Sequence, residues 1–269
     1  MEIAGYIAAV FIGIVLGMMG GGGSILTVPV LVYLFYVNPL TATTYSLFIV
    51  GVTSMTGGAR AYSKKQVDFK SVTEFGIPSI FAIFITRHFL LPAIPGDHLF
   101  SIGKIDFTRD LLLMIVFALL MLLASVFMIL NADEVKGQHE GSQEKNNKVL
   151  HLAILGFLIG IITGLLGAGG GFLIIPALIL FMRLPMKMAI GTSLVIIAIN
   201  SIFGFLFSLK QTPLDWQILL LFTSLSVVGI YIGSAFAEKI PGKTLKKWFG
   251  YFVLIMAVYI IIKELLLKN

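Results

Sequence analysis

Long apolar segments separated by short polar ones dominate the pattern of the chain. Six of them have about 20 residues, the length that an α-helix needs to cross the hydrocarbon core of a bilayer: Thr41–Ala61, Val72–Leu91, Leu111–Leu130, Ala189–Leu209, Leu214–Ala237 and Leu245–Leu266. Hydrophobic residues make up 58% of the 269 residues and charged ones only 12%, too few to cover a soluble protein of this size. The pattern predicts an all-α polytopic membrane protein.

Two further apolar segments carry the same glycine-rich motif. Gly13–Leu31 recurs 147 residues later as Gly160–Leu178, and nine of the 19 positions are identical. The match continues at the same offset to Asp68 and Asp215, and the one long polar segment lies between the two copies. We therefore expect a first repeat, a solvated linker and a second repeat, at residues 1–131, 132–148 and 149–269.

Each glycine motif is expected to break a helix. Helical sequence before the first motif runs from about Ile3 to Leu16 and resumes from about Ser24 to Val37. Each piece has about 14 residues and a length of roughly 21 Å, which is short of the roughly 30 Å hydrocarbon core. The two pieces form either one long kinked span or a hairpin that enters and leaves the membrane on the same side.

The distribution of Lys and Arg separates these two topologies, because cytoplasmic loops of membrane proteins are enriched in both residues. If both glycine segments span the membrane, the 19 Lys and Arg residues divide 10 to 9 between the two faces. If both segments are re-entrant hairpins, the division is 13 to 6. The hairpin topology leaves three full spans in each half, so it predicts two inverted repeats with both termini outside the cell.

Glycine at the density of the inner motif permits positive φ and lets a backbone or a ligand approach closely. The half-helices after the glycines direct free N–H groups and positive dipole ends toward the middle of the membrane. Two such ends make an anion site without a buried basic side chain. Gly13 with Gly17, and Gly160 with Gly164, have the GxxxG spacing that favours helix packing instead. The candidate substrate-binding residues are therefore the inner ones: Gly20, Gly22, Gly23, Ser24, Gly167, Gly169, Gly170 and Gly171.

Small polar residues follow each motif on the next predicted helix. Neutral hydroxyl and amide donors suit a small oxyanion that must bind and then leave. Hydrogen bonding between helices of the bundle is the alternative role for such residues. On this ground the candidate substrate site also includes Ser46, Ser54, Thr192, Ser193, Asn200 and Ser201.

Charged residues point to ordinary structural roles. Asp68 and Asp215 are each expected to cap the helix that follows. Arg87 and His88 have no counterpart in the second half. We expect them to anchor a helix end at the membrane interface, and attraction of anions or proton relay is the alternative.

The remaining composition excludes several classes of function. The chain has no cysteine, no His, Asp and Glu cluster with metal-ligand spacing and no evident nucleophile–base pair. We therefore expect neither an enzyme nor a bound metal or cofactor. The net charge of +6 is spread over short loops, which suits contact with lipid headgroups better than binding of nucleic acid.

The doubled motif, G-x3-G-x2-G-x-G-G-x5-P, resembles that of the sulfite exporter TauE/SafE family, also called the toluenesulfonate uptake permeases. The resemblance includes the element A-x-G-T-S-L, which is intact at Ala189–Leu194 and altered at Ala42–Leu47, where Thr44 and Tyr45 replace Gly and Thr. It implies a permease of a prokaryotic cytoplasmic membrane that moves sulfite, thiosulfate or organosulfonates such as sulfoacetate. The altered element is expected to reshape one side of the substrate site.

Together, the residues and the resemblance predict a secondary transporter that exports small sulfur-containing anions by alternating access around the two glycine motifs. A passive anion channel and a membrane scaffold that transports nothing are the alternatives. The implied partners are the substrate anion and the lipid bilayer.

Overall fold

Every segment predicted to span the bilayer is helical in the computed structural model, which describes residues 2–21, 23–94, 100–102, 105–130, 145–167, 169–182, 184–209, 214–237 and 242–266. These helices are α3 (Pro39–Ser63), α4 (Phe69–Ile85) with its continuations η1 (Thr86–Leu90) and α5 (Leu91–Ala93), α6 (Arg109–Leu130), α9 (Met186–Ser208), α10 (Trp216–Ala237) and α11 (Gly242–Leu266). Among the described residues, three helices are long and apolar enough to cross a membrane: Phe69–Ala93, Met186–Ser208 and Trp216–Phe236. The expected fold class, an all-α polytopic membrane protein, is confirmed.

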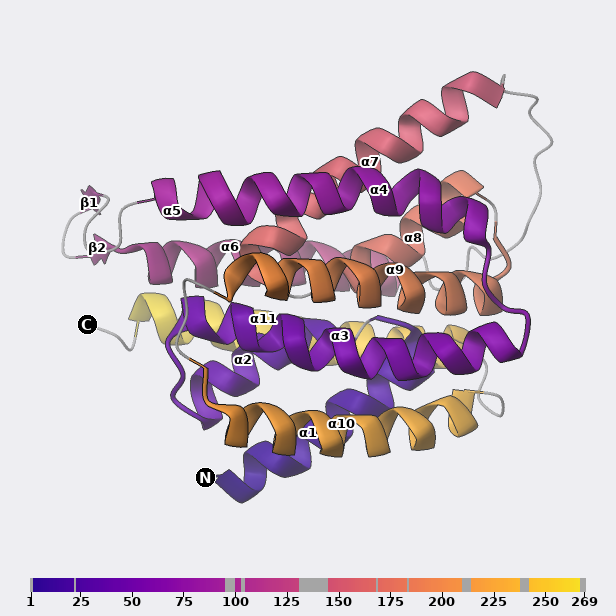
Figure 1. Ribbon diagram of the computed structural model, residues 1–269. Coiled ribbons are helices and arrows are strands. Elements are labelled where there is room, and N and C mark those ends of the chain that lie inside the picture. Colours follow the sequence, from indigo (N-terminus) through magenta and orange to yellow (C-terminus); the bar gives the residue numbers. More distant parts are fainter. Residues whose placement is uncertain are drawn as a thin grey trace.

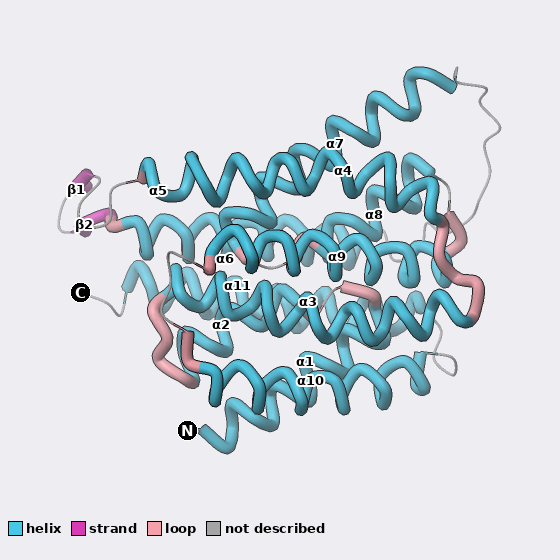
Figure 2. Tube along the Cα trace, in the orientation of Figure 1, coloured by secondary structure: helices cyan, strands magenta, loops and turns pink. Residues whose placement is uncertain are grey.

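A short β-hairpin departs from the all-helical expectation. β1 (Phe100–Ile102) pairs antiparallel with β2 (Ile105–Phe107), with Phe100 opposite Phe107. Figure 2 shows this hairpin at one end of the molecule, between α5 and α6. Its strands have three residues each, which is too short for a period-two pattern to emerge from the sequence.

The glycine motifs separate two helices in each half, as predicted, but α1 with 18 residues and α7 with 22 are longer than the expected length of about 14 residues. α1 (Glu2–Met19) and α2 (Ser24–Leu34) flank the first motif, and α7 (Lys145–Leu166) and α8 (Gly171–Met182) flank the second. In Figure 1, α2 leads back to the left-hand end, where α3 begins, and α8 leads back to the right-hand end, where α9 begins. The helix α7 begins inside the predicted linker, of which residues 132–144 lie outside the described part of the chain.

The predicted helix caps are confirmed. The carboxylate of Asp68 accepts a hydrogen bond from the backbone N–H of Ser71 at 3.1 Å, at the start of α4. The carboxylate of Asp215 accepts the N–H groups of Gln217 at 2.9 Å and Ile218 at 3.1 Å, at the start of α10. These bonds satisfy N–H groups that the first helical turn leaves without an intrahelical partner.

The two halves of the chain interlock. α1 packs along α10 and α7 along α4, so each helix that precedes a glycine motif lies against a helix of the other half. α3 packs along α9 and α6 along α11. A Cβ on Gly13 would collide with the carbonyl group of Ser226 in α10, and a Cβ on Gly160 with that of Ser79 in α4. The packing role predicted for the outer glycines is confirmed at these two positions.

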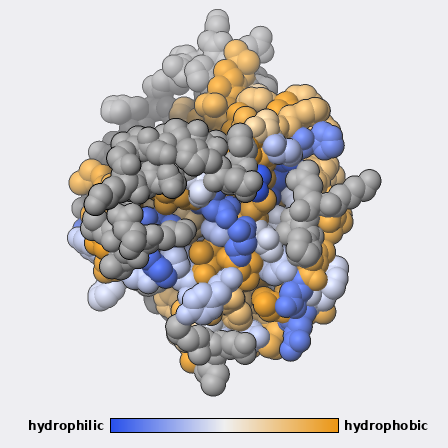
Figure 3. All heavy atoms as spheres, turned by 90° about the vertical axis from the view of Figure 1, so that its left-hand side faces the viewer, coloured by the Kyte–Doolittle hydropathy of each residue, from blue (hydrophilic) through white to orange (hydrophobic). Residues whose placement is uncertain are grey.

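Equivalent helices of the two halves run in opposite directions. In Figure 1, α3 runs from left to right, whereas α9 beside it runs from right to left. α1 begins and α11 ends at the left-hand end, and the start of α7 lies at the opposite one. The end-on view of Figure 3 shows hydrophilic residues gathered on the left-hand end and hydrophobic ones along its rim.

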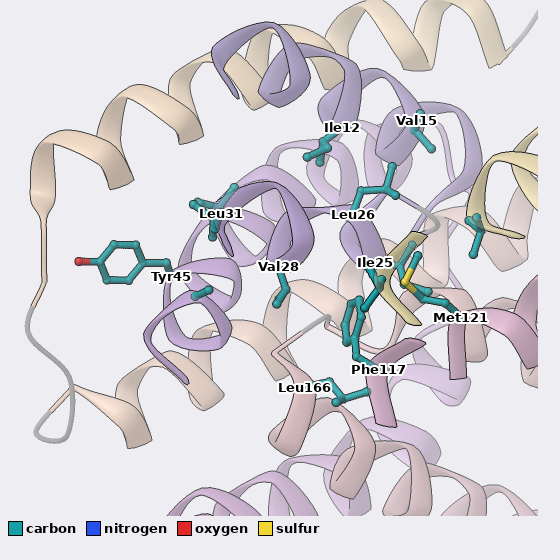
Figure 4. Packing of buried hydrophobic residues seen from close by; sticks show 14 of the residues in the cluster. Ile12, Val15, Ile25, Leu26, Val28, Leu31, Tyr45, Phe117, Met121 and Leu166 are labelled. Atoms are coloured by element: carbon teal, nitrogen blue, oxygen red, sulfur yellow. The ribbon is translucent and has the colours of Figure 1, made fainter. Parts of the chain in front are cut away.

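Apolar side chains join the first glycine hairpin to α6, the last helix of the same half. Figure 4 shows Ile25 of α2 next to Phe117 and Met121 of α6, and Ile12 of α1 and Leu26 of α2 belong to the same buried cluster. Large apolar side chains are also exposed around the bundle, which suits contact with lipid: Ile7, Phe81, Leu119, Leu158, Leu220 and Ile255.

Candidate functional site

The two glycine motifs meet inside the bundle. A Cβ placed on Gly171 would lie only 2.8 Å from the carbonyl oxygen of Gly21, so the two backbones are in direct contact. Side chains rarely adopt a left-handed φ, and five glycines of the motifs have φ between 61° and 147°: Gly20, Gly21, Gly167, Gly169 and Gly170. Only glycine provides both these turns and this close approach.

Each motif also touches the helix that follows the other motif. A Cβ on Gly20 would lie 2.8 Å from the carbonyl oxygen of Ile190 in α9, and a Cβ on Gly167 would lie 2.6 Å from the Cα of Thr43 in α3. Gly167 and Ile190 are the positions 147 residues after Gly20 and Thr43. The junction of the motifs therefore has pseudo-twofold symmetry.

Four candidate residues place buried polar atoms on α3 and α9, the two helices that contact the motifs. Their side chains are fully buried, and among the described residues these atoms have no hydrogen-bond partner: Oγ of Ser46, Ser54 and Ser201 and Nδ2 of Asn200. A Cβ on Gly169 would lie 3.0 Å from Ser201 Oγ. A buried polar group without a partner costs free energy, so four such groups on two helices require an explanation, and a binding site provides one.

Asn200 has its orientation fixed by a second helix. Its Oδ1 accepts a hydrogen bond from Ser79 Oγ of α4 at 2.8 Å, and Ser79 itself is fully buried. With Oδ1 occupied in this way, Nδ2 is the group of Asn200 that can donate to a ligand.

Other candidates have structural roles within their own hairpin. Ser24 Oγ donates to the carbonyl oxygen of Gly21 at 2.7 Å and closes the turn before α2. A Cβ on Gly23 would collide with the backbone of α1, and a Cβ on Gly170 would collide with the hydroxyl of Thr163 in α7. Gly22 lies outside the described residues.

Two candidate hydroxyls of α9 are used to join the halves. Ser193 Oγ donates to the carbonyl oxygen of Gly20 at 2.5 Å. Thr192 Oγ1 accepts the backbone N–H of Asp68 at 2.9 Å. The structure therefore separates the predicted hydroxyls into a set that holds the fold and a set with unoccupied polar atoms.

Arg87 is a buried basic residue beside the second motif, and the expectation that it anchors a helix at the interface is wrong. Its side chain is 1% exposed. The guanidinium donates to Thr43 Oγ1 at 3.1 Å and to Thr44 Oγ1 at 3.3 Å, and Thr43 is the residue that contacts Gly167. A buried basic side chain therefore lies beside the candidate site, for which the sequence predicted helix ends without such a side chain.

The burial of Arg87 follows from the face of α4 on which it lies. Ser79, Ile83 and Arg87 are spaced by four and share a helix face, and all three are buried where α4 and η1 pack against α7 and α9. His88 lies one position further, is exposed, and stacks on Phe84 with ring centroids 5.5 Å apart. The four-residue spacing is the signal in the sequence that could have identified Arg87.

A basic cavity lies between α1, α3, α9 and α10. Arg60, Lys64 and Lys187 line it, and its inner wall includes Gly17 and Ile190, the residue that contacts Gly20. Its volume of about 90 Å³ exceeds the roughly 10–15 Å³ that one water requires, so it has room for a small oxyanion. The cavity leads from the end of α3 toward the glycine junction.

Broken helices that meet at a buried polar junction, with a basic cavity beside it, define a membrane transporter of the helical class. The chain belongs to the sulfite exporter TauE/SafE family, which matches residues 6–260. Described parts of the chain contain no group of three or more potential metal ligands.

Several curated proteins that are similar to the chain are named probable membrane transporter proteins. Two come from strains of Xylella fastidiosa: one is 31% identical over 257 residues and the other 29% identical over 260 residues, each covering 93% of this chain and 91% of the relative. A relative from Bacillus subtilis is 25% identical and covers 96% of this chain and 95% of its own length. No solved structure matches the chain significantly.

Proposed function

We propose that the protein is a secondary transporter that moves small sulfur-containing anions across the cytoplasmic membrane, in the direction of export. The observation that carries the proposal is the set of unsatisfied buried donors on Ser46, Ser54, Asn200 and Ser201 of α3 and α9, of which Ser201 Oγ lies 3.0 Å from the Cβ position of Gly169. Hydroxyl and amide donors bind an oxyanion without holding it as tightly as a salt bridge would. The family name supports sulfite and related anions as substrates.

The basic cavity supports a path for the anion to this site. Arg60, Lys64 and Lys187 raise the local concentration of anions at its mouth, and Ile190 at its inner wall lies against the first glycine motif. The inside-negative membrane potential favours export by about 2.3 kcal/mol per charge per 100 mV, so export needs no coupled proton.

Alternating access is the mechanism that the symmetry favours. The opposite directions of α3 and α9 in Figure 1 support two inverted repeats, and such repeats rock against each other around a site at their interface. The first turns of α4 and α9 and the last turn of α3 carry Lys70, Lys187 and Arg60 at one end of the molecule, whereas α1 begins at the other. With the positive-inside rule, this distribution supports our proposal that the termini lie outside the cell.

The test is flux into proteoliposomes of sulfite, thiosulfate, sulfoacetate, sulfate and acetate, with and without a pH gradient. We expect saturable flux of at least one of the first three anions and counterflow exchange of that anion. A conductance that does not saturate would identify a channel instead. If none of the five anions moves, the proposal is wrong.

A further inference from the structure

The basic cavity has a counterpart across the pseudo-twofold axis. A Cβ on Gly57, in the cavity wall, would lie 3.2 Å from Leu194 Cδ1, and a Cβ on Gly204 would lie 3.1 Å from Leu47 Cδ1. Gly204 and Leu194 are 147 residues after Gly57 and Leu47. The same offset of 147 residues relates Ile230 of the cavity wall to Ile83. The Cγ2 atom of Ile83 lies 3.3 Å from the Cβ position of Gly204. The fold therefore contains two walls with corresponding residues, one in the cavity and one in its counterpart.

The two walls differ at their mouths. Arg60 and Lys187 at the mouth of the cavity correspond to Phe207 and Leu40 in the counterpart. Both of these residues are partly buried, and Phe207 packs edge-on against Phe84 with centroids 5.2 Å apart. The mouth of the counterpart is apolar at these two positions, where the mouth of the cavity is cationic.

The charge of the counterpart lies deeper. Ser234 in the cavity accepts a hydrogen bond from Arg60 at 2.6 Å, and the position 147 residues before Ser234 is Arg87. Each wall thus has one arginine, but the two arginines do not occupy corresponding positions. α3 supplies Arg60 to the cavity, and η1 supplies Arg87 to the counterpart. Arg60 is partly exposed, whereas Arg87 is buried with its guanidinium on the hydroxyls of Thr43 and Thr44.

We infer that Arg87, with Thr43 and Thr44, forms a second anion-binding subsite, which opens to the side of the membrane opposite the basic cavity and is closed in this conformation. The inference rests on the proposed transport function and assigns the residue that receives the anion on the far side. When that side opens, the anion replaces the two threonine hydroxyls as the acceptor for the guanidinium. The planar guanidinium fits the paired oxygens of a sulfonate or sulfite.

Two buried hydroxyls beside this subsite support the inference. Thr86 adjoins Arg87 in the chain, and Thr163 lies in α7 next to Gly164, where a Cβ would lie 2.7 Å from Thr86 Cβ. Both threonines are fully buried, and neither Oγ1 has a hydrogen-bond partner within the described ranges. Thr86 and the guanidinium are polar groups inside the candidate span Phe69–Ala93, where such groups indicate function.

The experiment compares Arg87→Gln with Arg60→Gln in membrane vesicles of the two orientations, with radiolabelled sulfite and thiosulfate as probes. Arg87→Gln should raise the half-saturation concentration about tenfold or more for anions offered from the side opposite the cavity, as expected for a lost charge-assisted hydrogen bond. It should leave the half-saturation concentration on the cavity side within about twofold of the wild type. Arg60→Gln should show the reverse. Equal effects of Arg87→Gln on both sides, or none, would overturn the inference.

His88→Gln is the matched control, because His88 is the exposed neighbour of Arg87 and has no part in the proposed subsite. It should leave both half-saturation concentrations unchanged. Arg87→Lys keeps the positive charge but lacks the planar guanidinium with its paired donors. It should recover part of the affinity that Arg87→Gln loses. A purely structural Arg87 would instead show the same loss on both sides.

A cysteine pair tests the subsite even if Arg87→Gln fails to fold. The chain has no cysteine, so Leu194→Cys and its counterpart Leu47→Cys each introduce a single thiol. An anionic, membrane-impermeant methanethiosulfonate should modify Leu194→Cys from the cavity side and Leu47→Cys from the opposite side. Modification of Leu47→Cys from the cavity side only, or from neither side, would contradict the inference.

The outcomes separate this inference from the proposed function. If the wild type moves no anion, the transport function fails and the inference fails with it. If the wild type moves an anion but Arg87 has no side-dependent effect and Leu47→Cys is inaccessible from the far side, only the inference fails.

Discussion

The hydroxyl of Tyr45 accepts a hydrogen bond at 2.6 Å from the backbone N–H of Asp215, the residue that caps α10. Thr192, 147 residues after Tyr45, accepts the corresponding bond from the N–H of Asp68 at 2.9 Å. Tyr45 and Thr192 differ in size but make equivalent connections across the two halves: Tyr45 joins α3 to the start of α10, and Thr192 joins α9 to the start of α4. Tyr45, which replaces a Thr of the family element, therefore joins the start of α10 to α3. The expectation that this replacement reshapes the substrate site stays a prediction.

Tyr45→Phe should destabilise the protein by about 1 kcal/mol, because it removes one hydrogen bond between the halves and leaves the ring in place. Thermal unfolding in detergent, compared with the wild type, measures the effect. Tyr62→Phe is the control, since Tyr62 is exposed and should unfold like the wild type. An unchanged stability of Tyr45→Phe would show that this bond contributes nothing to the fold.

Ser54→Ala and Ser201→Ala should weaken transport without weakening the fold. Neither hydroxyl has a hydrogen-bond partner in the described part of the chain, so its removal costs no protein–protein bond and relieves a desolvated polar group. We expect stability equal to or above that of the wild type and a half-saturation concentration raised about tenfold, the effect of one lost hydrogen bond of about 1.4 kcal/mol.

The control for these serines is Ser125→Ala in α6. Ser125 is also fully buried, but its hydroxyl donates to the carbonyl oxygen of Leu122 at 2.7 Å. It should leave the transport affinity unchanged. If Ser54→Ala and Ser201→Ala lose stability but keep their affinity, the two hydroxyls belong to the fold and not to a binding site.

Gly171→Ala should destabilise the junction of the motifs by roughly 1–3 kcal/mol through overpacking. The added methyl group would meet the backbone of Gly21 and the side chain of Ile197. Gly76→Ala is the matched comparison, because a Cβ there has no neighbour within 4 Å among the described residues. In the interior of α4 that change should stabilise the helix by about 0.5–1 kcal/mol. Chemical denaturation of both variants gives the two values, and a stable Gly171→Ala protein would argue against a tight junction.

Reporter fusions test the topology. A reporter that is active only outside the cytoplasm should be active when fused after residue 269 and inactive when inserted in the linker at residues 132–148. An inactive reporter at the C-terminus would place that end in the cytoplasm and would refute both the orientation and the re-entrant hairpins inferred from the Lys and Arg distribution.

The helices and the broken motifs could be predicted from the sequence because their causes are local. Apolar length identifies the spans, and α2 and α8 begin at Ser24 and Gly171, as expected, because glycine ends the preceding helix. The burial of Arg87 could not be predicted in the same way, since it depends on which helices of the other half cover its face of α4. The hydrogen bond from the N–H of Asp68 to Thr192 could not be predicted for the same reason, because it joins helices of different halves. A pattern within one helix does not specify its partner across the halves.

The interlocking of the halves has a consequence for how such a chain can be assembled. α1 lies along α10 and α7 along α4, and α3 and α6 pack along their own counterparts α9 and α11. A lone half would leave these surfaces uncovered, and it could bury them only against a second copy inserted upside down. The duplication turns what would be the interface of an antiparallel dimer into the interior of one polypeptide, so that neither half must find a partner in the membrane.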